Sequence, residues 1–209
     1  MLSLHTIAAS ALALFSVVNA APAGLDDVPD VSKYAIVPIS WDLPVKLDDP
    51  SAGNVTVTGT IQEAIAQMEA SYPGWNSTFQ SKLQDPSSDP SLGLAASGDP
   101  DDHTDCKPKQ WKYAGVLSIS WGVEYLRELT GTAKNGPGPG ECGRVSCSWQ
   151  SAIWWCNDND VSKELQWSQI ADGAAYINKN CNVEASYVKG QAFYKDKWNV
   201  IVRYDNDNC

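Results

Sequence analysis

The hydrophobic pattern of the chain is clearest in residues 142–160, which hold three of the six cysteines and three of the nine tryptophans. Read as one extended strand with period two, the run is polar on one face of its first half and apolar on both faces of its second half. A strand that is apolar on both faces is covered on both sides. We therefore expect a central strand that ends at the Asn and Asp turn of residues 157–160.

Two helices are predicted by apolar residues at spacings of three and four. The first covers residues 117–130 and ends before Gly131, and the second covers about residues 167–180. A hairpin with strands at 187–194 and 198–204 is predicted to follow. The faces expected to be buried are Ile119, Val123, Leu126 and Leu129 in the first helix, and Trp167, Ile170, Ala174 and Ile177 in the second.

The two predicted helices have similar sequences around a central glycine, Gly122 in the first and Gly173 in the second. Each is followed by a strand that ends in a turn of Asn and Asp residues. One interpretation is an internal repeat of helix and strand, in which each glycine lets its helix lie close to a sheet. The other is chance similarity between short amphipathic helices.

The fold class predicted for the second half of the chain is α+β. Residues 106–209 are expected to form a disulfide-stabilised, two-layer sandwich of an antiparallel sheet and two main helices. Residues 21–76 are predicted to be a small acidic strand-helix unit, with a strand at 54–58 and a helix opened by a capping box. Residues 77–105, rich in Ser, Asp, Pro and Gly, are predicted to be a flexible linker.

Two prolines shape the prediction for residues 34–45. Pro38 and Pro44 interrupt an otherwise β-rich segment and remove backbone N–H donors. We therefore expect an edge strand or an extended strap, and not a central strand.

The first 20 residues have the features of a secretory signal peptide. An apolar segment too short to span a membrane comfortably is followed by small residues, and cleavage is expected after Ala20. No later stretch is apolar and long enough for a span, so we expect a secreted, extracellular protein. Asn54 and Asn76 begin N-glycosylation acceptor tripeptides, which also occur by chance.

The six cysteines all lie in the second half of the chain and predict three disulfides in an exported protein. A zinc site is the alternative, but there is no Cys-X-X-Cys pair and one histidine follows the signal peptide, so we predict no metal. The sequence leaves the pairing open among Cys106, Cys142, Cys147, Cys156, Cys181 and Cys209.

Charge is distributed unevenly along the chain. Residues 21–105 hold 3 basic and 14 acidic residues, whereas residues 106–209 hold 12 basic and 11 acidic residues. Phosphate binding needs a basic face, so the near balance in the second half argues against nucleic acid as a partner.

The residue types argue against most enzyme classes, and we assign no catalytic residue and expect no cofactor. His103 lies in the acidic predicted linker, which argues against a nucleophile activated by histidine. Asp158 and Asp160 have the spacing of a calcium loop, but Lys163 and Gln169 occupy its sixth and twelfth positions, where Gly and Glu are expected. A small glycoside hydrolase stays open, because two carboxylates suffice. The candidates are Glu124, Glu141, Asp158, Asp172 and Asp205.

Nine tryptophans are many for 209 residues. Most are expected in the core, and Trp155 and Trp167 are predicted there. Trp111 and Trp198 are flanked by lysines, so we expect them to be exposed and to face a ligand. Aromatic platforms that stack on sugar rings would make the protein a binder of cell-wall chitin or glucan.

Several segments carry a family resemblance: CGRVSCSWQSAIWWCNDN, the IADGAAYI helix, the closing VKGQAFYKDKWNVIVRYD, and the earlier NVTVTGTIQEAIAQMEASYPGW. They resemble a large group of small secreted fungal proteins. More remotely, the order of elements is similar to necrosis-inducing extracellular effectors of plant-pathogenic fungi and to the α/β-sandwich killer toxins of corn smut. The resemblance implies a secreted, non-enzymatic effector or killer-toxin-like protein that acts on a host or competitor cell, and it transfers no functional residue.

Overall fold

The computed structural model describes residues 34–84, 100, 102–206 and 209. The predicted signal peptide and residues 85–99 of the predicted linker lie outside the described residues. The elements in chain order are β1 (Ala35–Ile36), β2 (Ser40–Pro44), η2 (Pro50–Ala52), β3 (Asn54–Thr58), α1 (Ile61–Ser71), α2 (Trp75–Leu83), β4 (Thr104–Asp105), β5 (Ala114–Gly115), α3 (Val116–Glu128), β6 (Thr132–Asn135), β7 (Glu141–Ser148), β8 (Ser151–Asn157), β9 (Lys163–Gln166), α4 (Trp167–Asn180), β10 (Asn182–Val183), β11 (Tyr187–Val188), β12 (Gly190–Tyr194) and β13 (Trp198–Tyr204).

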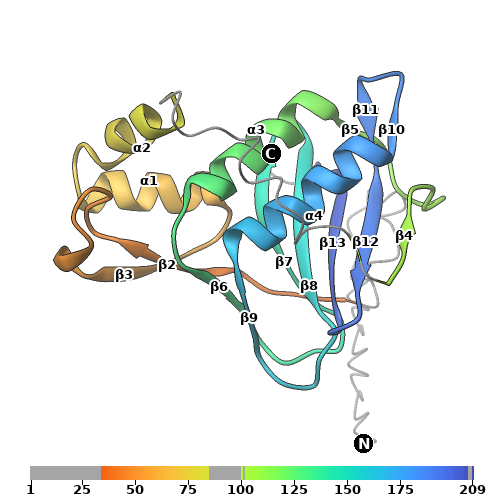
Figure 1. Cartoon of the computed structure of the whole chain (residues 1–209), viewed down its shortest axis with the longest axis horizontal. Coiled ribbons are helices and arrows are strands. Elements are labelled where there is room, and N and C mark those ends of the chain that lie inside the picture. Colours follow the sequence, from red (N-terminus) through yellow and green to blue (C-terminus); the bar gives the residue numbers. More distant parts are fainter. Residues whose placement is uncertain (1–33, 85–99, 101, 207–208) are drawn as a thin grey trace, which may run out of the picture.

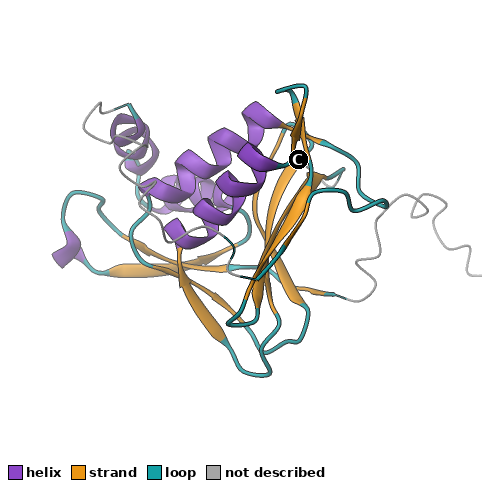
Figure 2. Ribbon diagram, turned by 45° about the vertical axis from the view of Figure 1, so that its right-hand side comes forward, coloured by secondary structure: helices purple, strands orange, loops and turns teal. Residues whose placement is uncertain are grey.

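The fold is a disulfide-stabilised α+β arrangement, as predicted. Its main sheet has six strands in the order β1-β7-β8-β13-β12-β4, antiparallel except where β1 pairs with β7. Helices α3 and α4 lie side by side on one face of this sheet, as Figure 1 shows. Figure 2 shows the helices in the angle between the main sheet and a second sheet of order β3-β2-β6-β9.

The expectation of one long strand across residues 142–160 is wrong. The segment is a hairpin, in which β7 and β8 pair antiparallel and Trp149 and Gln150 form the turn. The turn breaks the period-two pattern, and a register shift between Arg144 and Ser146 breaks it again. The hairpin therefore places Cys147 on the opposite face of the sheet from Ile153.

The second half of that segment is the predicted central strand. β8 lies between β7 and β13, and all seven of its residues are buried. Ile153 and Trp155 face the helices, whereas Ala152, Trp154 and Cys156 form a smaller cluster on the opposite face. The apolar character of both faces is explained by these two layers.

The predicted helix faces are confirmed. Ile119, Val123 and Leu126 of α3 and Trp167, Ile170, Ala174 and Ile177 of α4 are buried. The two glycines allow the close approach expected of them. A Cβ on Gly122 would lie 2.7 Å from Ser146 Oγ, and one on Gly173 would lie 2.8 Å from Val200 Cγ2.

The amino-terminal residues do not form a separate unit, which corrects the predicted division at residues 76 and 105. β2 lies between β3 and β6, so it is an interior strand of the second sheet, and not the edge strand or strap that we expected. Pro44 is tolerated because it stands at the last position of β2, beyond the short pairing with β6. Trp41 of β2 stacks on Trp167 of α4 with ring centroids 3.7 Å apart.

The predicted start of the linker, at residue 77, is also wrong. Residues 77–83 belong to α2, because Trp75, Phe79 and Leu83 recur every fourth residue and face the core. Trp75 Nε1 donates to the carbonyl of Pro44 at 2.9 Å and fixes α2 against the second sheet.

All six cysteines are paired, as predicted. Cys142–Cys156 joins β7 to β8, Cys147–Cys209 ties the hairpin to the last residue, and Cys106–Cys181 ties the segment after β4 to the end of α4. The last two close loops of 62 and 75 residues. In the chain-entropy account, each such bridge contributes about 4 kcal/mol by restricting the unfolded chain.

Candidate functional site

The two tryptophans predicted to face a ligand are buried, so that prediction is wrong. Trp111 is 5% exposed and Trp198 is 4% exposed. Trp198 begins β13 and stacks on Tyr194 at 3.7 Å, while its neighbour Lys197 lies in the turn and is exposed. Successive side chains in a strand point to opposite faces, so a flanking lysine does not report the exposure of a tryptophan.

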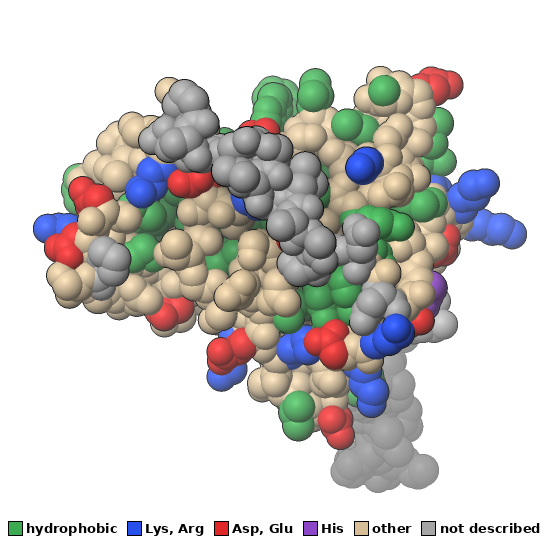
Figure 3. All heavy atoms as spheres, viewed as in Figure 1, with side chains coloured by type: hydrophobic (Ala, Val, Ile, Leu, Met, Phe, Trp, Pro, Cys, Tyr) green, Lys and Arg blue, Asp and Glu red, His purple; other side chains and the backbone are tan. Residues whose placement is uncertain are grey.

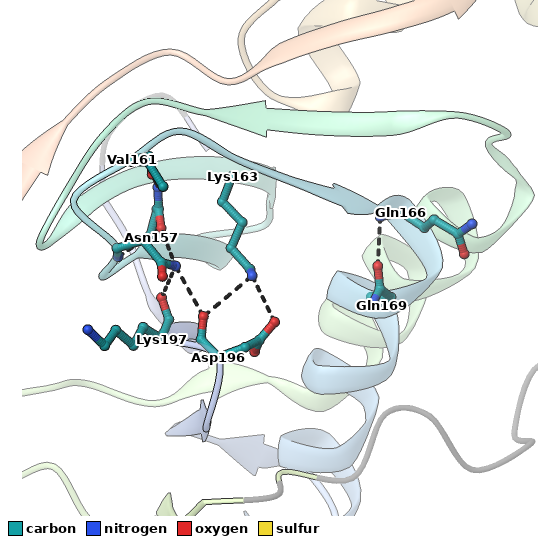
Figure 4. Close-up of polar contacts among 8 residues, drawn as sticks. Asn157, Val161, Lys163, Gln166, Gln169, Asp196 and Lys197 are labelled. Atoms are coloured by element: carbon teal, nitrogen blue, oxygen red, sulfur yellow. Dashed lines mark hydrogen bonds and ion pairs between the residues drawn. The ribbon is translucent and has the colours of Figure 1, made fainter.

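The Asn and Asp turn after β8 connects the ends of neighbouring strands through side-chain hydrogen bonds. Asn157 is at its centre: Nδ2 donates to the carbonyl of Val161 at 2.8 Å (Figure 4) and to the carbonyl of Gly136 at 2.7 Å. Asp158 accepts from Gly140 N–H (3.2 Å) and from Asn199 Nδ2 (2.7 Å). These bonds hold together the ends of several strands, and they occupy both carboxylate oxygens of Asp158.

An ion pair lies beside the same turn. Lys163 Nζ lies 2.7 Å from Asp196 Oδ2, so the start of β9 is joined to the β12–β13 turn (Figure 4). Within the described residues, no three His, Cys, Asp or Glu side chains come together in a group that could hold a metal ion.

Two of the carboxylates considered for glycoside hydrolysis, Asp172 and Asp205, are held by different arginines. Asp172 on α4 accepts from Arg127 on α3 at 2.9 Å, and Asp205 lies 3.5 Å from Arg144 Nη1. Burial raises the pKa of the Asp172 carboxyl above its ordinary value, and the hydrogen bond from Arg127 opposes that rise. These pairings are those of structural ion pairs.

His103 stands apart from these groups. Its ring stacks on Phe193 with centroids 4.2 Å apart, and Nδ1 lies 3.2 Å from Asp102 Oδ2. Both side chains are more than half exposed. The arrangement anchors the segment beside β12, where the carbonyl of His103 accepts from Phe193 N–H.

A group of exposed apolar side chains lies where the β7–β8 turn, the start of α3 and β11 meet. We call this group the aromatic end. Figure 3 shows hydrophobic atoms along the upper edge of the molecule, over the start of α3 and the β10–β11 hairpin. The members of the aromatic end, with their exposed fractions, are Leu117 (69%), Trp121 (46%), Trp149 (78%) and Tyr187 (55%).

Hydrogen bonds of ordinary length hold the three elements of the aromatic end together. Ser151 Oγ accepts from Gly115 N–H at 3.0 Å and donates to the carbonyl of Trp149 at 3.1 Å. Tyr187 lies directly opposite Gly115 in the β5–β11 pair, and Val116 N–H donates to the carbonyl of Ser186 at 3.0 Å. The apolar side chains therefore extend from backbone segments that are hydrogen-bonded to one another.

Trp149 has an unusual backbone conformation for its type. Its φ is +49° and that of Gln150 is +56°, the left-handed values of a type I′ turn. Asn and Gly are favoured there, and a bulky residue pays about 1–2 kcal/mol for this conformation. A tryptophan that is both strained and 78% exposed gains no compensating burial within the chain. Backbone outliers of this kind cluster at functional sites.

Sequence reasoning missed the aromatic end because it extended one strand through Trp149. The available signal was the interruption of apolar residues at 148–151, with Cys142 and Cys156 at similar distances on either side. That spacing is typical of a hairpin whose two strands are joined by a disulfide.

The two glycosylation acceptors differ in setting. Asn54 is exposed at the start of β3, where its Nδ2 donates to Asp42 Oδ2 at 3.0 Å. Asn76 is half-buried in the first turn of α2, and its N–H donates to Glu69 Oε2 at 2.8 Å. An acceptor asparagine must lie on the surface, so Asn54 fits the requirement better than Asn76.

Comparisons with known proteins give no relative. No family model matches the chain, and no curated protein and no solved structure matches it either. Among the described residues, no helix has the length and apolar composition needed to cross a membrane.

Proposed function

We propose that the protein is a secreted, non-enzymatic effector or killer-toxin-like protein, which acts on a host or competitor cell by docking its aromatic end on a protein of that cell. The observation that carries the proposal is Trp149, which is 78% exposed at a positive φ. Exposed tryptophan and tyrosine on a rigid support are typical of the residues that dominate binding energy in protein interfaces.

The composition of the aromatic end favours a protein over a polysaccharide as the partner. Leu117 is 69% exposed and stands one turn before Trp121 on the same face of α3. Aliphatic side chains beside aromatic ones suit the apolar centre of a protein interface. Stacking on sugars uses flat rings alone, so Leu117 has no evident role there.

Binding to cell-wall chitin or glucan is the second candidate. Trp149 and Tyr187 both present exposed rings, which is the residue type that a sugar-binding platform requires. The two candidates differ in the target and in the contribution expected from Leu117.

The test applies the full mature chain, with its disulfides intact, to plant leaves by infiltration and to cultures of competing fungi. We expect necrosis or growth inhibition by the natural chain and at least a tenfold loss of potency for Trp149→Ala and Leu117→Ser. The matched control is Val161→Ala, which truncates a 63% exposed apolar residue in the loop at the opposite end of β8.

Each outcome separates the candidates. Equal potency of Trp149→Ala and the natural chain would contradict the proposal. Retention of the chain on insoluble chitin or β-glucan, lost in Trp149→Ala and kept in Leu117→Ser, without toxicity, would favour the polysaccharide binder.

A further inference from the structure

β3 is an edge strand of the second sheet, at the lower left of the molecule in Figure 1, and it shares no residue with the aromatic end. Its sequence, NVTVT, consists mainly of valine and threonine, which favour strands, and it holds no charged residue and no proline. Asn54, Thr56 and Thr58 are exposed. An exposed strand edge of this composition is a place where a second strand can add to the sheet.

The other edges of the two larger sheets have features that oppose such pairing. β1 and β4 are two residues long, Pro38 follows β1 closely, and β4 contains Asp105. β9 contains Lys163 and Glu164. Short length, proline and charge are the usual means by which a protein protects an edge. β3, with five residues, has none of them.

The register of β3 on β2 leaves alternate backbone groups facing outward. Gly59 N–H donates to the segment before β2 at 3.0 Å, and hydrogen-bonded pairs alternate with non-bonded pairs in an antiparallel ladder. The bonds to β2 therefore fall on the odd-numbered residues, and the even-numbered residues face the open edge. Gln67 Nε2 of α1 donates to the Thr58 carbonyl at 2.6 Å. Among the described residues, Asn54 and Thr56 are left without a backbone partner on that side.

A second copy of the chain fits this part of the edge in an antiparallel register. Asn54 of each copy lies opposite Thr56 of the other, and each of these pairs exchanges two backbone hydrogen bonds. Val55, which is half-buried and packs against the core, then lies opposite its own copy on the two-fold axis. The strand is uncharged, so the two edges meet without repulsion between charges in the strands.

The acceptor of a glycosylation tripeptide stands at this contact. The Asn54 side chain lies on the outer face of the sheet, where its Nδ2 donates to Asp42 Oδ2 at 3.0 Å. In the paired register, the Cβ of the partner's Thr56 would lie about 5 Å from that of Asn54, as in any directly opposed pair. A sugar chain on Asn54 and a second copy therefore compete for the same space.

We infer that β3 pairs with β3 of a second copy of this chain, and that an N-glycan on Asn54 prevents this pairing. The unmodified chain forms a two-fold dimer in which the second sheet runs continuously through both copies. The glycosylated chain stays monomeric. The glycan thus gives β3 the protection that length, proline and charge give to the other edges.

The test compares two forms of the full mature chain with its disulfides intact. Both carry Asn76→Gln, so that Asn54 is the one acceptor asparagine in the sequence. The first form is secreted from a glycosylating host, and intact-mass spectrometry measures the occupancy of Asn54. The second form also carries Asn54→Gln. In sedimentation velocity up to millimolar concentration, we expect the first form to remain a monomer and the second to reach the mass of a dimer.

A charge at the edge locates the contact. Thr56→Lys, added to the Asn54→Gln chain, should restore the monomer, because it places two lysines beside the two-fold axis. The matched control is Thr132→Lys, which adds the same charge to an exposed position of β6 and should leave the dimer intact. Amide exchange at Thr56 should slow as the Asn54→Gln chain dimerises.

Four outcomes would overturn the inference. They are an Asn54→Gln chain that stays monomeric at millimolar concentration, a dimer that survives Thr56→Lys, a glycosylated chain that dimerises equally well, and a secreted chain in which Asn54 carries no glycan.

Discussion

The Asp172 side chain shows how one residue joins the two main helices. It lies on α4, is 11% exposed, and accepts a hydrogen bond from Arg127 of α3 at 2.9 Å. Burial disfavours the ionised form and raises the pKa of the carboxyl. Because the folded-state pKa is raised, the contribution of this group to stability is greatest at low pH and is lost as the pH rises through that pKa.

We predict that an NMR titration of the Asp172 carboxyl carbon gives a midpoint above 3.8, its ordinary pKa. Arg127→Met should move the midpoint higher, because the cation and its hydrogen bond favour the charged form. Glu69 serves as the internal control: hydrogen bonds from Gly74 and Asn76 N–H lower its pKa below 4.5, and it lies outside the α3–α4 contact. A midpoint below 3.8 for Asp172 would show that the ion pair outweighs burial.

Residue-level exposure was predictable for some tryptophans and not for others. Trp155 and Trp167 are fully buried, as their apolar surroundings in the sequence predict. Trp111 and Trp198 are buried despite neighbouring lysines, because exposure follows the direction of each side chain and not the charge of its neighbour. Trp149 is exposed because a turn, which the strand pattern hid, places it outside the sheet.

The two central glycines set how closely the helices approach the sheet. A Cβ on Gly173 would lie 2.8 Å from both Tyr194 Oη and Val200 Cγ2, closer than packed atoms normally come. Both contacts come from the β12–β13 hairpin beneath α4. The helix-sheet distance therefore depends on the absence of one methyl group.

We predict that Gly173→Ala lowers the free energy of unfolding by about 1–3 kcal/mol, the usual cost of overpacking. Helix propensity alone predicts the opposite sign, a gain of about 1 kcal/mol for Ala over Gly. Urea denaturation measures the difference, with Lys179→Ala on the exposed side of α4 as the control, expected within about 0.5 kcal/mol of the natural chain. A stabilised Gly173→Ala variant would show that α4 lies farther from the sheet.

At the level of elements, the 3.6-residue period located both main helices, and alternation located the β12–β13 hairpin. The amino-terminal region was harder to predict from the sequence. Pro38 precedes β2 and Pro44 ends it, yet β2 is an interior strand of the second sheet. Its partner β6, which in turn pairs with β9, is a short strand distant in sequence, and no local pattern reports such pairing. The Trp41–Trp167 stack joins β2 of the second sheet to α4 in the core of the molecule.

The whole molecule is built around a symmetric arrangement of two helix-hairpin pairs. In the order β7-β8-β13-β12, one hairpin lies beside the other, with α3 over the first and α4 over the second. This arrangement fits the internal repeat inferred from the similar helix sequences. The turn of the first hairpin carries Trp149, whereas the turn of the second lies at the opposite end, where Asp196 contacts Lys163.

The central claim is that the strained Trp149 turn is kept for binding at the expense of stability, and one paired measurement tests it. Replacing the turn by Trp149→Asp with Gln150→Gly should raise the free energy of unfolding by about 1–2 kcal/mol, because these residues suit a type I′ turn. The same variant should lose its action on target cells.

The control relieves strain in the neighbouring turn of β10 and β11, where Glu184 and Ala185 have φ of +54° and +53°. Glu184→Asp with Ala185→Gly should gain similar stability and keep full activity, because it leaves every side chain of the aromatic end in place. A Trp149→Asp and Gln150→Gly variant that is more stable and as active as the natural chain would contradict the account.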